Sequence, residues 1–256
     1  MNFRKLRLFL LGIYFLLTFG SMEVYSKEIL VAAAANIQYA LQDIVDKFQK
    51  NSGITVKTVY NSSGKLTAQI LNGAPFDIFL SADLKYPEIL DSAGLAIRTP
   101  EIYAYGSLII WTTKTLDFNM GFPSLLDRKI NRIAIPNPNT APYGKAAMQA
   151  INFYNVGEEL HRKIVYGRNV TNVNQYVLSG AVDAGITAKS VVFYSEFSNI
   201  GNWIEIDPES YSPIAQAVVV LNHEKKDHIE DAMKFHNFIF SEDAKKILKA
   251  YGYNCE

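Results

Sequence analysis

The sequence predicts an α/β fold of two lobes, each a mostly parallel sheet flanked by helices, with a ligand cleft between them. Short β-branched and apolar runs alternate with amphipathic stretches, which is typical of β-α units and a parallel sheet. This rhythm breaks near Gly106 and restarts near Ile130, as expected when the chain leaves one lobe and begins another. A last strand-like run at 214–221 and two closing helices follow the second set of units. We therefore expect the chain to return near Ile206 and complete the first lobe.

The first 26 residues are predicted to be a signal peptide rather than part of this fold. A basic start (Arg4, Lys5 and Arg7) precedes an apolar run over residues 8–17. That run is shorter than the roughly 20 residues that a membrane-spanning helix needs. Small residues before and at Ser26 predict cleavage after it. We therefore expect export to the periplasm as a soluble protein, without a lipid anchor because no cysteine lies near this point.

Charge and cysteine content exclude several classes of protein. The signal peptide carries three of the 25 basic and one of the 25 acidic residues, so that the remaining chain has a net charge of −2. With no clustered basic excess, a nucleic-acid-binding protein is excluded. Cys255 is the only cysteine, which rules out an internal disulfide and a cysteine-based metal site. We expect it to be a free surface thiol.

The first lobe is predicted over residues 27–106, from three β-α units. In each unit a strand-like run is followed by a stretch whose apolar residues fall on one face at helical spacing. The predicted units are a strand at 28–34 with a helix to Asn51, a strand at 54–59 with a helix through Leu66 and Ile70, and a strand at 76–80 with a helix from Ser81 to Gly94. Residues 207–256 complete this lobe, with a strand at 214–221 and helices near 225–240 and 244–251.

The second lobe is predicted over residues 107–206. Its expected strands lie at 108–112, 130–135, around Val165, at 183–187 and at 203–206, and its expected helices at 143–153, 158–163 and 168–179. Two chain crossings between the lobes would form a hinge beside the cleft.

Four predicted turns share one pattern: a strand ends, small polar residues follow, and a helix starts. They are Ala34-Ala35-Asn36, Asn61-Ser62-Ser63-Gly64, Thr140-Ala141-Pro142-Tyr143-Gly144 and Asn169-Val170-Thr171. In open α/β sheets such turns lie beyond the carboxyl ends of the strands, where ligands bind. The first turn of a helix offers unpaired backbone N–H groups and a partial positive charge. Serines there can either cap the helix or help it to hold an anion.

Two of these turns would come from each lobe and face each other across the cleft. Together they offer hydroxyls, an Asn amide and backbone N–H groups, and none of them contains a carboxylate or centres on a required Lys or Arg. Such a set of donors favours a small, fully ionised oxyanion, because that ligand only accepts hydrogen bonds and a carboxylate would repel it.

At these turns the sequence resembles the periplasmic molybdate-binding proteins of ABC transporters, over essentially the whole chain after Ser26. The segments that carry the resemblance are VAAAANIQYALQDI, NSSGKLTAQILNGAPFDIFLSAD, IPNPNTAPYGKAA and the terminal AYGY. The resemblance implies a type II periplasmic-binding-protein fold, a monomer that binds molybdate or tungstate without a cofactor, and delivery to a membrane permease. It implies no catalytic residue.

Carried over by position, the oxyanion contacts of that family fall on Asn36, on Ser63 and on the backbone N–H groups of Tyr143 and Val170. Ala35 and Ser62 are further candidates. One departure concerns the position of Ala188, where many members of the family have a ligand-contacting tyrosine. Without that hydroxyl, another tetrahedral oxyanion such as sulfate stays open.

Parts of the sequence also fit two other functions. Ser62-Ser63-Gly64-Lys65 fits the S-x-x-K motif of penicillin-recognising enzymes, with Ser62 as nucleophile and Lys65 beside it, but the companion S-D-N and K-T-G motifs do not occur. A ferric-ion site could use Tyr176, Tyr194 and Tyr211.

A carboxylate pair for acid–base chemistry could be formed by Asp77 and Asp83. Asp83 follows Ser81 where a helix is expected to start, and a helix cap is the interpretation that this position favours.

Overall fold

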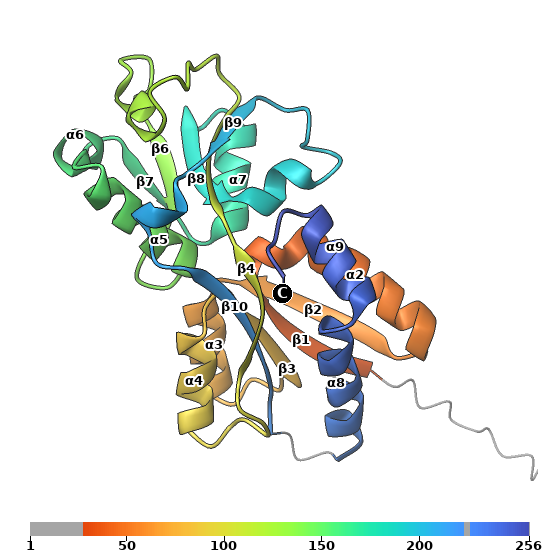
Figure 1. The fold of residues 1–256 in the computed structure, drawn as a ribbon. Coiled ribbons are helices and arrows are strands. Elements are labelled where there is room, and N and C mark those ends of the chain that lie inside the picture. The colour runs from red at the N-terminus through yellow and green to blue at the C-terminus, as the bar shows by residue number, and fades with distance from the viewer. Residues whose placement is uncertain (1–27, 223–225, 256) are drawn as a thin grey trace, which may run out of the picture.

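The computed structural model describes residues 28–222 and 226–255 and shows two lobes, each built on a five-stranded sheet with helices on both faces (Figure 1). In each sheet four strands run in one direction and one runs against them. The predicted two-lobed α/β fold is therefore confirmed. The predicted signal peptide lies outside the described residues. Within these, no helix is long and apolar enough to cross a membrane.

The first sheet has the strand order β2-β1-β3-β10-β4, and β10 is the reversed strand. Its strands are β1 (Glu28–Ala34), β2 (Thr55–Asn61), β3 (Ile78–Ser81), β4 (Glu101–Gly106) and β10 (Ile214–Val220). Its helices are α2 (Gln38–Ser52), α3 (Ser63–Leu71), α4 (Lys85–Ser92), α8 (Lys226–Ile239) and α9 (Glu242–Ala250), and the 3-10 turn η1 (Ala35–Ile37) leads into α2.

Helices cover both faces of this sheet, because its strands carry apolar side chains on each side. On one face α2, α8 and α9 bury residues such as Ile44 and Phe48, whose ring packs edge-on against Phe235 at 4.9 Å. On the other face α3 and α4 bury Leu66 and Leu90.

The second sheet has the order β7-β6-β8-β5-β9, with β5 reversed. Its strands are β5 (Leu108–Thr112), β6 (Ile133–Pro136), β7 (Ile164–Gly167), β8 (Ala184–Ala188) and β9 (Asn202–Glu205). Its helices are α5 (Pro142–Phe153), α6 (Gly157–His161) and α7 (Val170–Leu178), with 3-10 turns η2 (Phe122–Leu126), η3 (Lys189–Phe193) and η4 (Pro208–Ser210). α5 follows β6 and α7 follows β7, and these two parallel strands end at the same edge of the sheet, which faces the first lobe. The N-termini of both helices therefore point to the first lobe.

Two neighbouring strands carry the chain between the lobes. β4 leads into β5 through Ser107, and the chain comes back from β9 to β10, which pairs with β4 from Ile214↔Gly106 onward. The Tyr211 hydroxyl accepts a hydrogen bond from the backbone N–H of Leu108 (3.1 Å), which ties the returning segment to the outgoing one.

Two features of the first lobe differ from the sequence analysis. β4 was not predicted; only Tyr103 and Ala104 of its six residues are buried, so that it lacks a regular alternation. The surface thiol expected at Cys255 is wrong: Cys255 is free but buried among the residues that pack under α2, α8 and α9. The C-terminal segment is held over the edge strand, since Tyr105 and Asn254 exchange two backbone hydrogen bonds.

Candidate functional site

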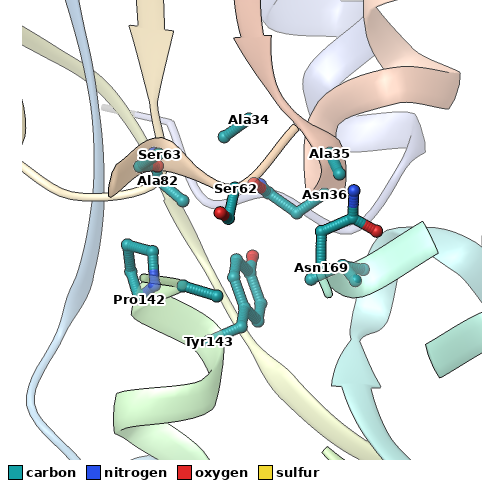
Figure 2. Close-up of a pocket in the computed structure, with 11 residues that line it drawn as sticks. Ala34, Ala35, Asn36, Ser62, Ser63, Ala82, Pro142, Tyr143 and Asn169 are labelled. Atoms are coloured by element: carbon teal, nitrogen blue, oxygen red, sulfur yellow. The ribbon is translucent and has the colours of Figure 1, made fainter. Parts of the chain in front are cut away.

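A small cavity lies between the lobes, at the four turns that the sequence analysis singled out (Figure 2). About 10 Å³ is open to the centre of a water-sized sphere, which suits a compact ligand rather than an extended organic one. Its lining comprises Ala34, Ala35, Asn36, Ser62, Ser63, Ala82, Ala141, Pro142, Tyr143, Asn169 and Val170. The structure thus brings together all six predicted site residues. Ala188 is buried at the end of β8 and is not part of this lining.

Four helix starts converge on the cavity, two from each lobe. They are η1 with α2 behind it, α3, α5 and α7. The N-terminus of a helix carries a partial positive charge and backbone N–H groups that no helical carbonyl accepts. The cavity is therefore electropositive although, among the described residues, no Lys, Arg, Asp or Glu side chain lines it.

The two serines of the first lobe differ in their hydrogen bonds. The Ser63 hydroxyl oxygen accepts a bond from the backbone N–H of Ala82 (3.0 Å), which holds that oxygen in place and leaves its proton free to donate. Ser62 occupies the N-cap position of α3, yet its side chain makes no capping bond. The interpretation of Ser62 as a side-chain cap is therefore wrong.

Asn36 is the centre of a buried network on the first-lobe side of the cavity. Its Nδ2 donates to Gln216 Oε1 (2.7 Å) and to the Tyr253 hydroxyl (3.0 Å). Its carbonyl oxygen accepts bonds from the hydroxyls of Tyr253 (2.9 Å) and Ser190 (2.7 Å). Both amide hydrogens are thus engaged within the protein, and the backbone N–H at the start of η1 is the donor that Asn36 can offer to a ligand.

Tyr143 reaches from the second lobe toward Asn36 and Ser62 (Figure 2). It is the second residue of α5, after Pro142, which has no N–H, so that the Tyr143 backbone N–H is the first donor of that helix. Its hydroxyl lies beside Gly106, the last residue of β4, where the chain passes from the first lobe to the second. A Cβ on Gly106 would clash with this hydroxyl. Burial raises the pKa of the Tyr143 phenol well above its ordinary value, and the phenol stays neutral.

On the second-lobe side another donor is the backbone N–H of Val170, the first residue of α7. The preceding Asn169 caps this helix, because its Oδ1 accepts a bond from the backbone N–H of Asn172 (2.9 Å). The Asn169 side-chain oxygen is thereby committed to the helix.

Direct contacts hold the two lobes together around the cavity. The backbone N–H of Gly64 in α3 donates to the carbonyl of Thr140 in the second lobe (2.9 Å). A Cβ on Gly64 would lie 2.6 Å from the Tyr86 hydroxyl and 3.1 Å from the Thr140 carbonyl oxygen, so that a side chain there would crowd this approach. Farther along the cleft, the Thr171 hydroxyl donates to Gln38 Oε1 (2.9 Å).

Asp77 and Asp83, the two candidates for an acid–base pair, lie apart. Asp83 Oδ1 accepts bonds from the backbone N–H of Tyr86 (3.2 Å) and from Ser81 Oγ (3.1 Å), as expected of a helix cap. Burial raises the pKa of Asp83. Asp77 lies at the other end of β3, where it accepts a bond from the backbone N–H of Leu30 and faces His228.

The three tyrosines considered for a ferric-ion site do not line this cavity and have contacts of their own. Tyr194 stacks on Tyr39 at 4.5 Å, the Tyr211 hydroxyl bonds to Leu108, and Tyr176 packs near the end of α7. Within the described part of the chain, no three His, Cys, Asp or Glu side chains gather as metal ligands.

Sequence reasoning missed four residues of this site: Ala82, Ser190, Gln216 and Tyr253. Ala82 holds Ser63 in place, and the other three surround Asn36. Tyr253 belongs to the AYGY segment of the resemblance and Ala82 to the segment that ends in FLSAD, which were the available signals. Ser190 and Gln216 carry no local pattern that points to a site.

Comparisons with known proteins agree with this geometry. A family model described as bacterial extracellular solute-binding protein matches residues 29–254. The Molybdate-binding protein ModA of Azotobacter vinelandii is 32% identical over 230 residues, which cover 90% of each chain. The solved periplasmic molybdate-binding protein of that organism superposes with a TM-score of 0.83, over 89% of this chain and 99% of its own. The sulfate-binding protein SubI of Mycobacterium tuberculosis (TM-score 0.70, 16% identical, covering 89% and 86%) shares the fold alone.

Proposed function

The chain belongs to the bacterial extracellular solute-binding proteins, and on that premise we propose that it captures molybdate or tungstate and delivers it to the permease of an ABC transporter. One observation carries the proposal: four helix N-termini from two lobes converge on a small cavity that no carboxylate lines. The relative that shares a third of its residues is named a molybdate-binding protein, which favours molybdate over sulfate.

The residues have distinct roles in this proposal. Asn36, Tyr143 and Val170 donate their backbone N–H groups, and Ser63 donates its hydroxyl. Ala35, at the start of η1, adds a backbone N–H. These neutral donors compensate the charge of the anion without a counter-ion, because hydrogen bonds to a charged acceptor are roughly twice as strong as neutral ones. Among the described residues that line the cavity, no carboxylate, histidine or lysine is placed to transfer a proton, so the anion is bound and released unchanged.

Transport requires that the protein work outside the cytoplasm. The N-terminal segment directs export to the periplasm and is removed near Ser26. The mature chain acts as a monomer, without a cofactor, and is not an enzyme. Opening and closing of the lobes about β4 and β10 would load the anion and present it to the permease.

A ligand panel tests this function. Molybdate, tungstate, sulfate, phosphate and ferric citrate are added singly to the purified protein, and the melting temperature is measured. At about 1,000 times the Kd, a ligand stabilises the fold by roughly 4 kcal/mol. We expect molybdate and tungstate to raise the melting temperature most, and molybdate to reduce the radius of gyration in small-angle scattering. If no oxyanion changes either quantity, the proposal is wrong; a response to sulfate alone would replace the ligand but keep the class.

A further inference from the structure

The Ser62 hydroxyl is a buried polar group without a partner. Ser62 is 3% exposed, and among the residues that the structure describes its Oγ has no hydrogen-bond partner. Its backbone is held, because the Ser62 N–H donates to Asn61 Oδ1 (2.9 Å). In Figure 2 the Ser62 hydroxyl points into the cavity above Tyr143, away from Asn36 and toward the side where Ala82 and Pro142 lie. A buried hydroxyl that lacks a partner destabilises a fold, so this one calls for a physical reason.

The chain contains a matched serine that shows what Ser62 could have done. Ser241 is the N-cap residue of α9, with φ −69° and ψ 157°, and Ser62 is the N-cap residue of α3, with φ −70° and ψ 147°. The Ser241 hydroxyl accepts a bond from the backbone N–H of Ala244 (3.2 Å). Ser62 has the same backbone conformation and makes no such bond. Its side chain is therefore turned from the helix toward the cavity, although the backbone permits the cap.

Each neighbouring polar side chain of the cavity already makes at least one hydrogen bond within the protein. Ala82 holds the Ser63 oxygen, the Asn36 amide hydrogens are taken by Gln216 and Tyr253, and Asn169 caps its own helix. Among the described lining residues, Ser62 is the one whose side-chain oxygen is buried without a hydrogen-bond partner, so that both its donor and its acceptor capacity are free.

We propose that the Ser62 hydroxyl donates a hydrogen bond to the bound oxyanion and that it is kept free of the helix for this purpose. The inference rests on the proposed oxyanion function and adds a ligand contact to it. It makes Ser62 a binding residue whose hydroxyl is satisfied only in the complex. The stability of the ligand-free protein and its affinity for the anion then oppose each other at this position.

The test compares Ser62→Ala with Ser241→Ala, which removes a hydroxyl from the same backbone geometry. The purified proteins are titrated with sodium molybdate in a calorimeter, and their ligand-free melting temperatures are measured. For Ser62→Ala we expect affinity to fall roughly 10- to 150-fold, the range for a bond to a charged group, with a ligand-free melting temperature no lower than that of the parent. For Ser241→Ala we expect the opposite: unchanged affinity and a lower melting temperature.

Two results would overturn the inference. If Ser62→Ala binds molybdate as the parent does, whether or not it melts lower in the manner of Ser241→Ala, then Ser62 is a structural residue and the carrier function still stands. If the parent itself binds no oxyanion, the carrier function fails, and the Ser62 contact fails with it.

Discussion

The two walls of the cavity hold the same kind of helix start but present different donors. The first-lobe wall brings the hydroxyls of Ser62 and Ser63 beside the backbone of Asn36. The second-lobe wall brings Tyr143 and Val170, whose backbone N–H groups are its donors at the start of α5 and α7. The comparison teaches that a side-chain change can remove a hydroxyl donor from the first wall, whereas the backbone N–H donors of the second wall are lost only when the backbone itself is changed.

The walls also differ in how their helix ends are stabilised. In the second lobe the Asn169 side chain caps α7, and in the first lobe the Ser62 side chain leaves α3 uncapped. In the ligand-free protein the side-chain oxygen at the start of α7 is thus hydrogen-bonded, while the hydroxyl at the start of α3 is not. Four substitutions or conditions, taken in order of expected effect, test this difference.

The largest effect is expected from a negative charge on the first wall. Asn36→Asp places a carboxylate beside the anion, and two unit charges about 4 Å apart repel by about 4 kcal/mol at an effective dielectric constant of 20. Affinity for molybdate should fall by a factor of about 1,000 or more, measured by calorimetric titration. Asn155→Asp, which adds the same charge at an exposed position, is the control and should bind normally. Normal binding by Asn36→Asp would remove Asn36 from the site.

A smaller effect is expected when the second wall loses one backbone donor. Val170→Pro removes the N–H at the first position of α7, where a helix tolerates proline and where the extended backbone of Asn169 accepts it. Affinity should fall roughly 10- to 150-fold. The matched variant Val170→Ala keeps the N–H and should bind as the parent does, although it packs less well. Equal titration curves for the two variants would contradict a backbone contact here.

The third substitution removes a hydroxyl that the protein itself also uses. Ser63→Ala should weaken molybdate binding about tenfold, because Ser62 remains beside it as a donor. It should also lower the ligand-free stability by about 1–3 kcal/mol, because the buried N–H of Ala82 loses its acceptor. Denaturant titration without ligand measures the second quantity. A stable Ser63→Ala protein with full affinity would show that the first wall does not depend on this hydroxyl.

The smallest effect is expected from pH. Tyr143 is the one titratable side chain among the described lining residues, and burial keeps its pKa well above the ordinary value of about 10. Affinity for molybdate should therefore be constant between about pH 6.5 and 9, when titrated in buffers of equal ionic strength. A tenfold change within this range would show that a titrating group contacts the anion.

Stability, in contrast to affinity, should respond to strongly alkaline pH. Burial raises the pKa of Tyr253 to about 12. In the unfolded chain a tyrosine titrates near 10. The fold favours the neutral phenol, so that this contribution is present below about pH 10 and is lost as the pH rises toward 12. Thermal melts across that range measure the loss.

Much of this protein could be predicted from the sequence alone. The strand runs, the amphipathic helices and the break near Gly106 predict two lobes, because hydrophobic periodicity is a local property of the chain. The four turns could be found for the same reason, since a strand end, small polar residues and a helix start follow one another directly. All six residues predicted to bind the ligand line one cavity.

The roles of those residues were decided by the tertiary structure. Asn36 donates to Gln216 and Tyr253, which are 180 and 217 positions away, and Ser63 is held by Ala82 of the next β-α unit. The burial of Cys255 likewise depends on distant segments of the first lobe. Sequence patterns place a hydroxyl at a helix start, but they do not show which group occupies its lone pairs. That depends on which other segments pack beside it, and for this reason the difference between Ser62 and Ser63 is visible only in the folded chain.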